Sequence, residues 1–302
     1  MYPPSDVMFK EGRPVVIRDA RSYDFTSAIT GGDYRILVYV PEARAPEGGF
    51  ATFYILDGGA WFGTVVEAVR SRMLGNEIVP AVVVGIGYQA DDLRTAGKLR
   101  FGDLTLPTGR DWLDSLAYKI PGLTAEMTGG AAAFLEMIER EVKPAVRRLA
   151  PINPSYESLF GHSLGGLTVL QALFSAPRSY RSFIASSPSI WWADSAILES
   201  EPGFAAVARE GQAQPRILIE VGGLEQTGSR AALRFFQSET LMNASLARSR
   251  MVDNADQLGR RLATLRGGPE YKAETVIFPG EGHGSVVAAA LGRAVSFALE
   301  YE

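Results

Sequence analysis

The strongest constraint on the fold is an alternation of short apolar runs with helical patterns along the chain. Seven of these runs are rich in β-branched and aromatic residues, and Gly or Pro bounds most of them, which predicts β-strands. They are residues 34–40, 51–56, 81–88, 157–162, 181–187, 216–222 and 273–278. The later runs are nearly continuous in apolar residues, as expected for strands that are covered on both faces.

Helical patterns lie between these runs. Three segments repeat apolar residues at intervals that place them on one helical face, namely 129–150, 251–268 and 285–301. In the first, Pro144 is expected to kink or restart the helix because proline has no amide hydrogen to donate. Strands that alternate with helices predict an α/β fold with a mainly parallel central sheet and helices on both faces.

Residues 89–128 interrupt the alternation. Charged residues, glycines and prolines are frequent there, and apolar periodicity is weak. A segment of this length without clear elements is usually a functional excursion or a disordered one. Because it also contains aromatic and aliphatic side chains, we expect an ordered cap or loop near the functional site. Since no repeat or low-complexity linker divides the chain, residues 1–302 are predicted to form a single domain.

Composition excludes several classes of function. The formal net charge of −4 argues against nucleic-acid binding, which needs a basic surface. The chain has no cysteine, so disulfides, cysteine-ligated zinc and a cysteine nucleophile are excluded. The sequence contains no run of about 18 apolar residues, so no membrane span is predicted. We expect no metal ion and no organic cofactor.

The N-terminal residues contain no apolar stretch of signal-peptide length. A cytoplasmic location is therefore expected, with a periplasmic or secreted location as the alternative if a leader has been removed. The sequence leaves the oligomeric state open.

One short motif carries a candidate nucleophile. Gly161-His162-Ser163-Leu164-Gly165 matches G-x-S-x-G, follows an apolar run and precedes a helical pattern, so Ser163 is expected at a strand-to-helix turn. Side chains at the flanking glycine positions would clash with the neighbouring turn. The Leu164 amide, at the helix N-terminus, could stabilise an oxyanion. The alternative is a glycine-rich packing turn with an incidental serine.

The chain has only two histidines, His162 and His283. A serine hydroxyl needs a base that accepts its proton near neutral pH, and histidine suits that task. Because His162 adjoins Ser163, its side chain should diverge from the hydroxyl and serve packing or hydrogen bonding. His283 follows the predicted strand 273–278, where a catalytic base belongs in such a sheet. The alternative for His283 is an ordinary surface-loop residue.

A catalytic acid is expected between the serine and the second histidine, in the order Ser, Asp or Glu, His. Glu225 lies just past the end of the predicted strand 216–222 and is the first choice. Glu220 lies within that strand and is less suitable. Asp253 and Asp256 are the alternatives, although both also suit the start of a helix, where the dipole favours acidic residues.

A second turn follows the predicted strand 51–56, in "YILDGGAWF". Gly58 and Gly59 allow close approach of the backbone to a substrate. The Gly59 amide is the natural second oxyanion donor. The alternative is a plain turn after a strand.

Together these stretches resemble the esterase-D-type branch of the α/β-hydrolases, and more narrowly the siderophore esterases that hydrolyse enterobactin and salmochelin. The resemblance covers about residues 33–300. It is carried by "YRILVYVP", "YILDGGAWF", "RFGDLTLPT", "FGHSLGGL", "ASSPSIWW", "VGGLEQ" and "PGEGHGS". The Ser and His motifs are specific to the superfamily, and "LDG" with "SPSIWW" narrows the match to this branch.

The resemblance implies an α/β-hydrolase fold, with Ser163 as nucleophile, His283 as base, and Gly59 and Leu164 as oxyanion donors. Some siderophore esterases in this branch work with a Ser–His dyad, so the resemblance leaves the role of Glu225 open.

The resemblance also implies substrate-binding residues. Arg100 matches a position that can contact anionic substrates, with an ion pair to Asp103 as the alternative. Trp191 and Trp192 could wall an aromatic substrate site or be buried structural residues. Trp61 also lies beside a candidate site loop, and tryptophans so placed suggest a pocket for a ring or a bulky acyl chain.

The sequence therefore predicts a serine carboxylic-ester hydrolase that forms an acyl-enzyme, acting on a small-molecule ester of aromatic or siderophore type. An acyltransferase would use the same residues with a different acyl acceptor, and a peptidase is a further alternative. A non-catalytic interaction protein on the same fold is the non-enzyme alternative, but such proteins typically lose the nucleophile or the base.

Overall fold

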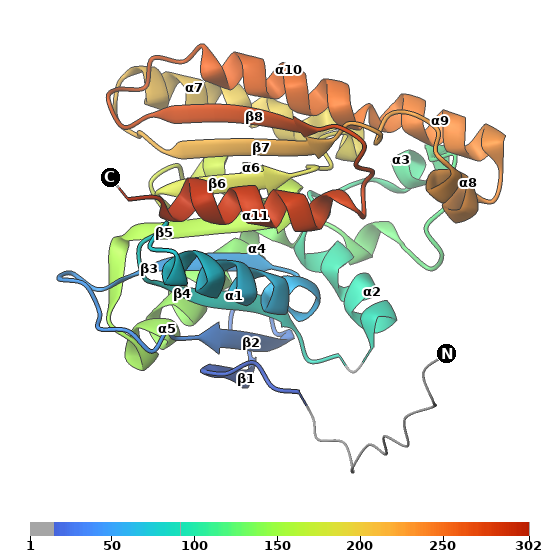
Figure 1. Ribbon diagram of the computed structural model, residues 1–302. Helices are drawn as coiled ribbons and strands as arrows, with labels where there is room; N and C mark the ends of the chain where they lie inside the picture. Colours follow the sequence, from blue (N-terminus) through green and yellow to red (C-terminus); the bar gives the residue numbers. More distant parts are fainter. Residues whose placement is uncertain (1–14, 91, 302) are drawn as a thin grey trace, which may run out of the picture.

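The computed structural model describes residues 15–90 and 92–301, which are built around one β-sheet (Figure 1). Within this part of the chain the sheet has eight strands in the order β1-β2-β4-β3-β5-β6-β7-β8. The strands are β1 (Ala20–Thr26), β2 (Asp33–Tyr39), β3 (Phe50–Leu56), β4 (Ala81–Tyr88), β5 (Ile152–His162), β6 (Ser182–Ser186), β7 (Arg216–Gly222) and β8 (Lys272–Phe278). All seven predicted strands are confirmed, and β1 is an addition.

The sheet is parallel from β4 to β8, and only β1 and β2 pair antiparallel with their neighbours. The prediction of a mainly parallel sheet is therefore confirmed. Strands β5, β6, β7 and β8 lie side by side, so their carboxyl ends meet at one edge of the sheet. Loops that leave this edge are the usual location of a binding or catalytic site in an open parallel sheet.

The helices were predicted only in part. In chain order they are α1 (Gly58–Leu74), α2 (Leu93–Asp103), α3 (Arg110–Ser115), α4 (Ala131–Met137), α5 (Lys143–Leu149), α6 (Leu164–Ser175), α7 (Glu201–Arg209), α8 (Arg230–Phe236), α9 (Glu239–Ser249), α10 (Met251–Ala263) and α11 (Val286–Leu299). Two 3₁₀ segments, η1 (Ala125–Met127) and η3 (Trp192–Ser200), and one π-helical turn, η2 (Ile138–Val142), complete the described elements.

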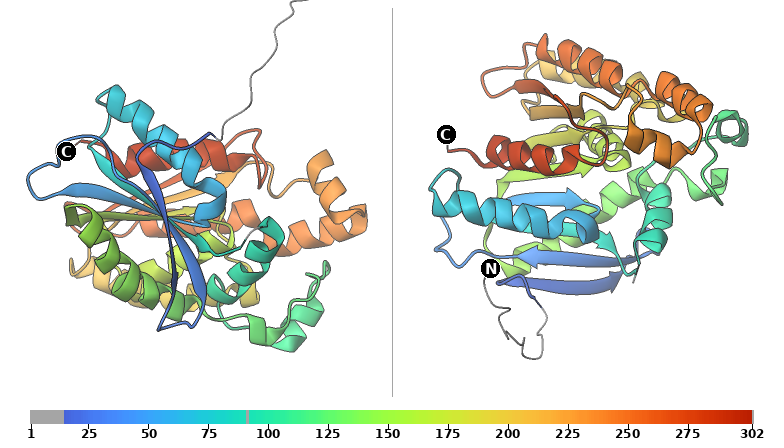
Figure 2. Two further views of the ribbon diagram at one scale, coloured as in Figure 1. Left: turned by 90° about the horizontal axis from the view of Figure 1, so that it is seen from below. Right: turned by 45° about the vertical axis from the view of Figure 1, so that its right-hand side comes forward.

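Helices cover both faces of the sheet, as predicted (Figure 2). On one face α1 and α11 pack onto the sheet through side chains such as Phe62 and Phe297. On the other face α4, α6, α7 and α10 form a second apolar layer that includes Phe134 and Phe204. The central strand β3 lies between the two layers and is buried along its whole length, which explains its continuous apolar sequence.

The predicted helix 129–150 is interrupted before its proline. The chain passes from α4 through the π-helical turn η2 into α5, which begins at Lys143 with Pro144 as its second residue. Proline is tolerated in the first turn of a helix, where its missing amide hydrogen costs no intrahelical bond. The expectation that Pro144 restarts the helix is therefore confirmed.

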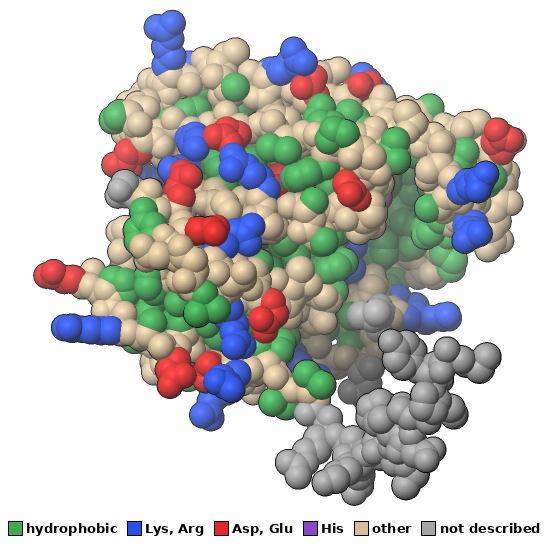
Figure 3. All heavy atoms as spheres, viewed as in Figure 1, with side chains coloured by type: hydrophobic (Ala, Val, Ile, Leu, Met, Phe, Trp, Pro, Cys, Tyr) green, Lys and Arg blue, Asp and Glu red, His purple; other side chains and the backbone are tan. Residues whose placement is uncertain are grey.

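Two insertions project from the carboxyl edge of the sheet (Figure 1). The first is the segment 89–128, which contains α2, α3 and η1 where only weak periodicity was seen. The second is the segment 226–250 with α8 and α9, which the sequence analysis missed. Tyr118 of the first insertion packs against Phe235 and Phe236 of the second, with ring centroids 5.3 Å apart in both pairs. The surface is hollowed beside α8 and α9, and apolar side chains gather there (Figure 3).

One acidic side chain lies inside the fold. Glu220 of β7 is fully buried, and within the described part of the chain neither carboxylate oxygen has a hydrogen-bond partner. Burial raises the pKa of Glu220 well above its ordinary value of 4.5, and the positive charge of Arg293 opposes this only in part. Burial therefore favours the neutral form of the Glu220 side chain in the folded protein, which agrees with the expectation that Glu220 is less suitable than Glu225 as the catalytic acid.

We expect Glu220→Gln to remove part of the pH dependence of stability. The unfolded chain loses the Glu220 proton above about pH 4.5 while the folded chain keeps it, so this group stabilises the fold fully at low pH. Its contribution is lost as the pH rises towards the raised pKa, by up to about 1.4 kcal/mol per pH unit.

Urea unfolding of wild type and variant at pH 5, 6.5 and 8 measures the effect. The stability of Glu220→Gln relative to wild type should increase with pH. Glu136→Gln, at an exposed position on α4, is the control. A constant difference between Glu220→Gln and wild type across this range would contradict the assignment.

Candidate active site

Ser163 lies at a sharp turn between β5 and α6. Its backbone φ of 61° is a left-handed conformation that is strained for a residue with a side chain. A Cβ on Gly161 would come within 2.3 Å of the Gly165 carbonyl oxygen, so that glycine is required by packing. A Cβ on Gly165 would make only ordinary contacts, whereas one on Gly166 would meet the Ser186 carbonyl oxygen at 2.8 Å. The steric argument is therefore correct for Gly161, wrong for Gly165, and applies to Gly166 instead.

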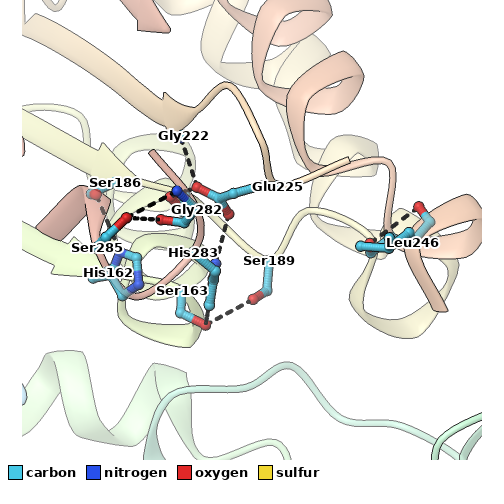
Figure 4. Close-up of polar contacts among 12 residues, drawn as sticks. His162, Ser163, Ser186, Ser189, Gly222, Glu225, Leu246, Gly282, His283 and Ser285 are labelled. Atoms are coloured by element: carbon cyan, nitrogen blue, oxygen red, sulfur yellow. Dashed lines mark hydrogen bonds and ion pairs between the residues drawn. The ribbon is translucent and has the colours of Figure 1, made fainter. Parts of the chain in front are cut away.

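His283 follows β8 and reaches the serine. Its Nε2 lies 3.1 Å from Ser163 Oγ, and its Nδ1 lies 2.6 Å from Glu225 Oε2. These side chains leave the carboxyl ends of β5, β7 and β8, which are close together in the sheet. Figure 4 shows the resulting hydrogen-bonded chain from Glu225 through His283 to Ser163. The structure thus brings together the three residues singled out from the sequence.

Glu225 is buried and its two oxygens have different partners. Oε2 faces His283, while Oε1 accepts hydrogen bonds from Ser187 Oγ at 2.5 Å and from the Gly222 amide at 2.7 Å. Asp253 instead pairs with Arg250. Asp256 pairs with Arg260 one turn along the same helix. The alternative acids are therefore occupied elsewhere, and Glu225 is the carboxylate that contacts the histidine.

The two amides proposed as oxyanion donors both stand at helix N-termini. Leu164 is the first residue of α6 and Gly59 the second residue of α1, so neither amide has an acceptor within its own helix. Strands β3 and β5 are paired with Ile55 opposite Phe160, so the turns that follow them are neighbours. A Cβ on Gly58 would meet the Gly85 backbone at 2.5 Å, whereas one on Gly59 would enter open space. Gly58 is therefore needed for packing of α1 on β4 and not for access by a substrate.

His162 lies beneath the other histidine. Its ring is buried, with Nδ1 3.2 Å from Ser186 Oγ and its centroid 4.7 Å from that of His283. Burial lowers the pKa of His162 well below 6.5, and the neighbouring His283 and Arg100 lower it further. A neutral His162 therefore places no positive charge beside the His283 ring. The expected packing and hydrogen-bonding role of His162 is thus confirmed.

Arg100 makes a different ion pair from the one expected. Its guanidinium donates two hydrogen bonds to Asp57, at 2.9 and 2.8 Å, and a longer one to the His162 carbonyl. The pairing with Asp103 is wrong, because that carboxylate accepts a hydrogen bond from Tyr34 instead. Arg100 therefore ties α2 to the turn that follows β3, and it is not a free cation for an anionic substrate.

The tryptophans divide into buried and accessible residues. Trp192 is fully buried and donates its Nε1 hydrogen to the Leu106 carbonyl, so its expected contact with substrate is wrong. Trp191 is only partly buried and stacks on Trp112 of α3, with ring centroids 5.9 Å apart. Trp61 is also partly buried and packs edge-on against His162. Trp112 of the first insertion and Trp191 thus form a partly exposed aromatic wall.

Arg248 of the second insertion joins this wall. Its guanidinium lies 5.4 Å from the centre of the Trp112 ring and hydrogen-bonds the Ser115 carbonyl and Asp194. Asp194 also accepts the Nε1 hydrogen of Trp112. No sequence signal pointed to Arg248, because its partners lie far away in the chain.

Two further observations concern classes of site. Among residues 15–90 and 92–301, no three or more carboxylate or histidine side chains are grouped so that they could hold a metal ion. In the same residues no helix has both the length and the apolar character needed to cross a bilayer.

Comparison with known proteins shows that this chain is similar to esterases. Residues 27–257 match the family described as "Putative esterase". The chain is 35% identical over 269 residues to ferri-bacillibactin esterase BesA of Bacillus subtilis, covering 88% of this chain and 84% of that protein. It is 32% identical over 278 residues to a siderophore triacetylfusarinine C esterase of Aspergillus fumigatus, covering 89% and 90%. Siderophore hydrolase EstA from Aspergillus nidulans has a similar structure, with a TM-score of 0.80 and 29% identity over 97% of this chain and 98% of that one.

Proposed function

The chain belongs to this esterase family, and from that premise we propose that it hydrolyses carboxylic esters with Ser163, His283 and Glu225 as its catalytic triad. The observation that carries the proposal is the unbroken hydrogen-bonded chain from Glu225 Oε2 through the His283 ring to Ser163 Oγ. A nucleophile, a base and a group that orients the base stand in the order that acyl transfer requires.

Acylation begins when Ser163 Oγ attacks the ester carbonyl carbon while His283 Nε2 accepts the hydroxyl proton. The carbonyl oxygen becomes an oxyanion, to which the amides of Leu164 and Gly59 donate hydrogen bonds. Glu225 accepts a hydrogen bond from the Nδ1–H group of His283, and its negative charge stabilises the imidazolium. The carbon–oxygen bond to the leaving alcohol then breaks, and the proton on Nε2 goes to that alcohol.

Deacylation repeats these steps with water. His283 takes a proton from the water as it attacks the acyl-serine carbonyl, and the second oxyanion forms in the same place. Its collapse breaks the bond to Ser163 Oγ, which regains the proton from Nε2 and releases the acid. Each step is a proton transfer or a substitution at the carbonyl carbon, and the triad side chains together with the amides of Leu164 and Gly59 supply the groups that these steps use.

For the substrate we propose a siderophore-type ester with an aromatic or bulky apolar part. The relatives named above act on siderophores. Trp191 and Trp112 offer a partly exposed aromatic wall of the kind on which a planar ring packs. The second insertion carries four arginines and one glutamate between residues 229 and 250, in a chain whose net charge is −4. Arg248 and Arg250 are paired with Asp194 and Asp253, so the local positive charge that suits an anionic substrate such as a catecholate comes from Arg230 and Arg234.

This substrate class predicts a ranking of esters. An aryl or hydroxybenzoyl ester and a catecholate trilactone should have a higher kcat/KM than a short alkyl ester such as ethyl acetate. Trp191→Ala should reduce the preference by about fivefold or more, because loss of one aromatic contact is worth roughly 1 kcal/mol or more. Steady-state kinetics of the panel on wild type and variant give the measurement.

Tyr23→Ala, an exposed aromatic change on the edge strand β1, is the matched control and should leave the ranking unchanged. If the short ester is preferred and Trp191→Ala does not alter the ranking, the substrate class is wrong although the esterase assignment stands. Added alcohols distinguish the acyltransferase alternative, since transfer would yield a new ester in place of the free acid.

A further inference from the structure

A turn of four residues contacts both ends of the catalytic chain. The turn begins at Ser186, the last residue of β6, and continues through Ser187, Pro188 and Ser189. The Ser186 carbonyl accepts the Ser163 amide hydrogen at 2.9 Å, and the Ser189 amide donates to the Ser163 carbonyl at 3.1 Å. Ser189 Oγ also lies 3.5 Å from Ser163 Oγ (Figure 4). The turn therefore holds the backbone of the nucleophile.

The remaining serine of this turn contacts the acid instead. Ser187 is fully buried, and its Oγ donates a hydrogen bond of 2.5 Å to Glu225 Oε1. The direction of donation is fixed, because the Gly222 amide is the second donor to the same oxygen and Oε2 faces His283. Hydrogen bonds to an ionised carboxylate are shorter and stronger than those between neutral groups.

The backbone of Ser187 is itself held in an unusual conformation. Its φ is 42°, in the left-handed region, and its amide donates to the Glu220 carbonyl of the neighbouring strand β7 at 2.6 Å. A non-glycine residue persists there only when its surroundings determine it. Here the left-handed turn follows directly on the end of β6, and the hydroxyl meets the carboxylate that leaves β7 three residues past its end.

We propose that Ser187 is a positioning residue that acts on the reaction through Glu225, as a fourth member of the hydrogen-bonded chain. This inference rests on the proposed triad. With Oε1 fixed by Ser187 and Gly222, only Oε2 is available to His283, and the carboxylate cannot rotate away from the ring. Ser187 is buried and contacts none of the reacting atoms, so its effect falls on kcat and not on KM.

Ser187→Ala should lower kcat about tenfold or more, the loss expected for a hydrogen bond to a charged group, while KM stays within about twofold. Ser182→Ala is the matched control, because Ser182 lies on β6, the strand that precedes Ser187, is fully buried, and has a hydroxyl without a partner among the described residues. It should leave kcat unchanged. Ser187→Gly is a second variant that removes the hydroxyl and accepts the left-handed backbone without strain.

The same change is then made in a Glu225→Ala background. If Ser187 acts through Glu225, adding Ser187→Ala or Ser187→Gly to Glu225→Ala should cause no further loss of kcat beyond about twofold. An equal loss in both backgrounds would mean that Ser187 merely maintains the turn, and would overturn the proposal. So would a wild-type kcat in both single variants.

A wrong assignment of the triad can be distinguished from a wrong role for Ser187, because Ser163→Ala would then keep its activity. Thermal unfolding of each variant verifies that the compared proteins are folded.

Discussion

Ser163→Ala is expected to lower kcat for ester hydrolysis by at least about a thousandfold while the protein stays folded. Removal of a triad nucleophile typically costs several orders of magnitude, and the residual rate comes from binding and the oxyanion donors. Among residues 15–90 and 92–301 the hydroxyl hydrogen-bonds only to His283 and Ser189, so the melting temperature should change little. Steady-state kinetics and thermal unfolding of the purified variant measure both effects.

A serine-directed phosphonate provides the complementary test. The reagent should modify wild type at Ser163 and at no other serine, and it should leave Ser163→Ala unmodified. Ser189→Ala is a useful control, because it removes the neighbouring hydroxyl and keeps the triad. If Ser163→Ala retains more than about a hundredth of the activity, the nucleophile has been assigned wrongly.

Glu225→Gln should reduce kcat by about a hundredfold or more. Oε1 accepts two hydrogen bonds, from Ser187 and Gly222, so the single amide oxygen of glutamine belongs at that position. The amide nitrogen then faces His283 Nδ1 and donates to it, which moves the ring proton to Nε2. A histidine with a proton on Nε2 cannot accept the Ser163 proton, and the wrong tautomer is a recognised cause of large losses in such triads.

Asp253→Asn is the matched control for this prediction. Asp253 is a partly exposed carboxylate that pairs with Arg250, so its neutralisation should leave kcat close to that of wild type. A large loss in Asp253→Asn with none in Glu225→Gln would reverse the assignment of the acid. If neither change matters, the enzyme works with Ser163 and His283 alone.

The sequence predicted best those elements that are mostly buried. Strand β3 is buried on both faces and therefore has a continuous apolar sequence. Strand β1 is largely exposed at the sheet edge, so no apolar run marked it. Helix α8 has no buried residue, and its exposed Leu233 and Phe235 gave no helical face to detect. Patterns of this kind record burial, and segments with little burial leave little pattern.

The residues of the site also differ in how well the sequence predicted them. The triad could be predicted because each member stands at the end of a strand, where the topology brings separate loops together. Trp191 and Trp192 could not be told apart, since adjacent residues in the turn point into different environments. The pairing of Arg100 with Asp57 joins residues 43 apart in the chain, and no local pattern records such a contact.

That ion pair also limits how this scaffold can be altered. Asp57 is only 13% exposed and precedes the turn that bears Gly59, while its partner Arg100 belongs to the first insertion. Exchanging residues 89–128 for a homologous segment that lacks the arginine would leave a nearly buried carboxylate without its counter-ion, which is strongly destabilising. The two residues must be inherited together. New substrate preferences are therefore expected to arise from single substitutions within residues 89–128, and not from exchange of the whole segment.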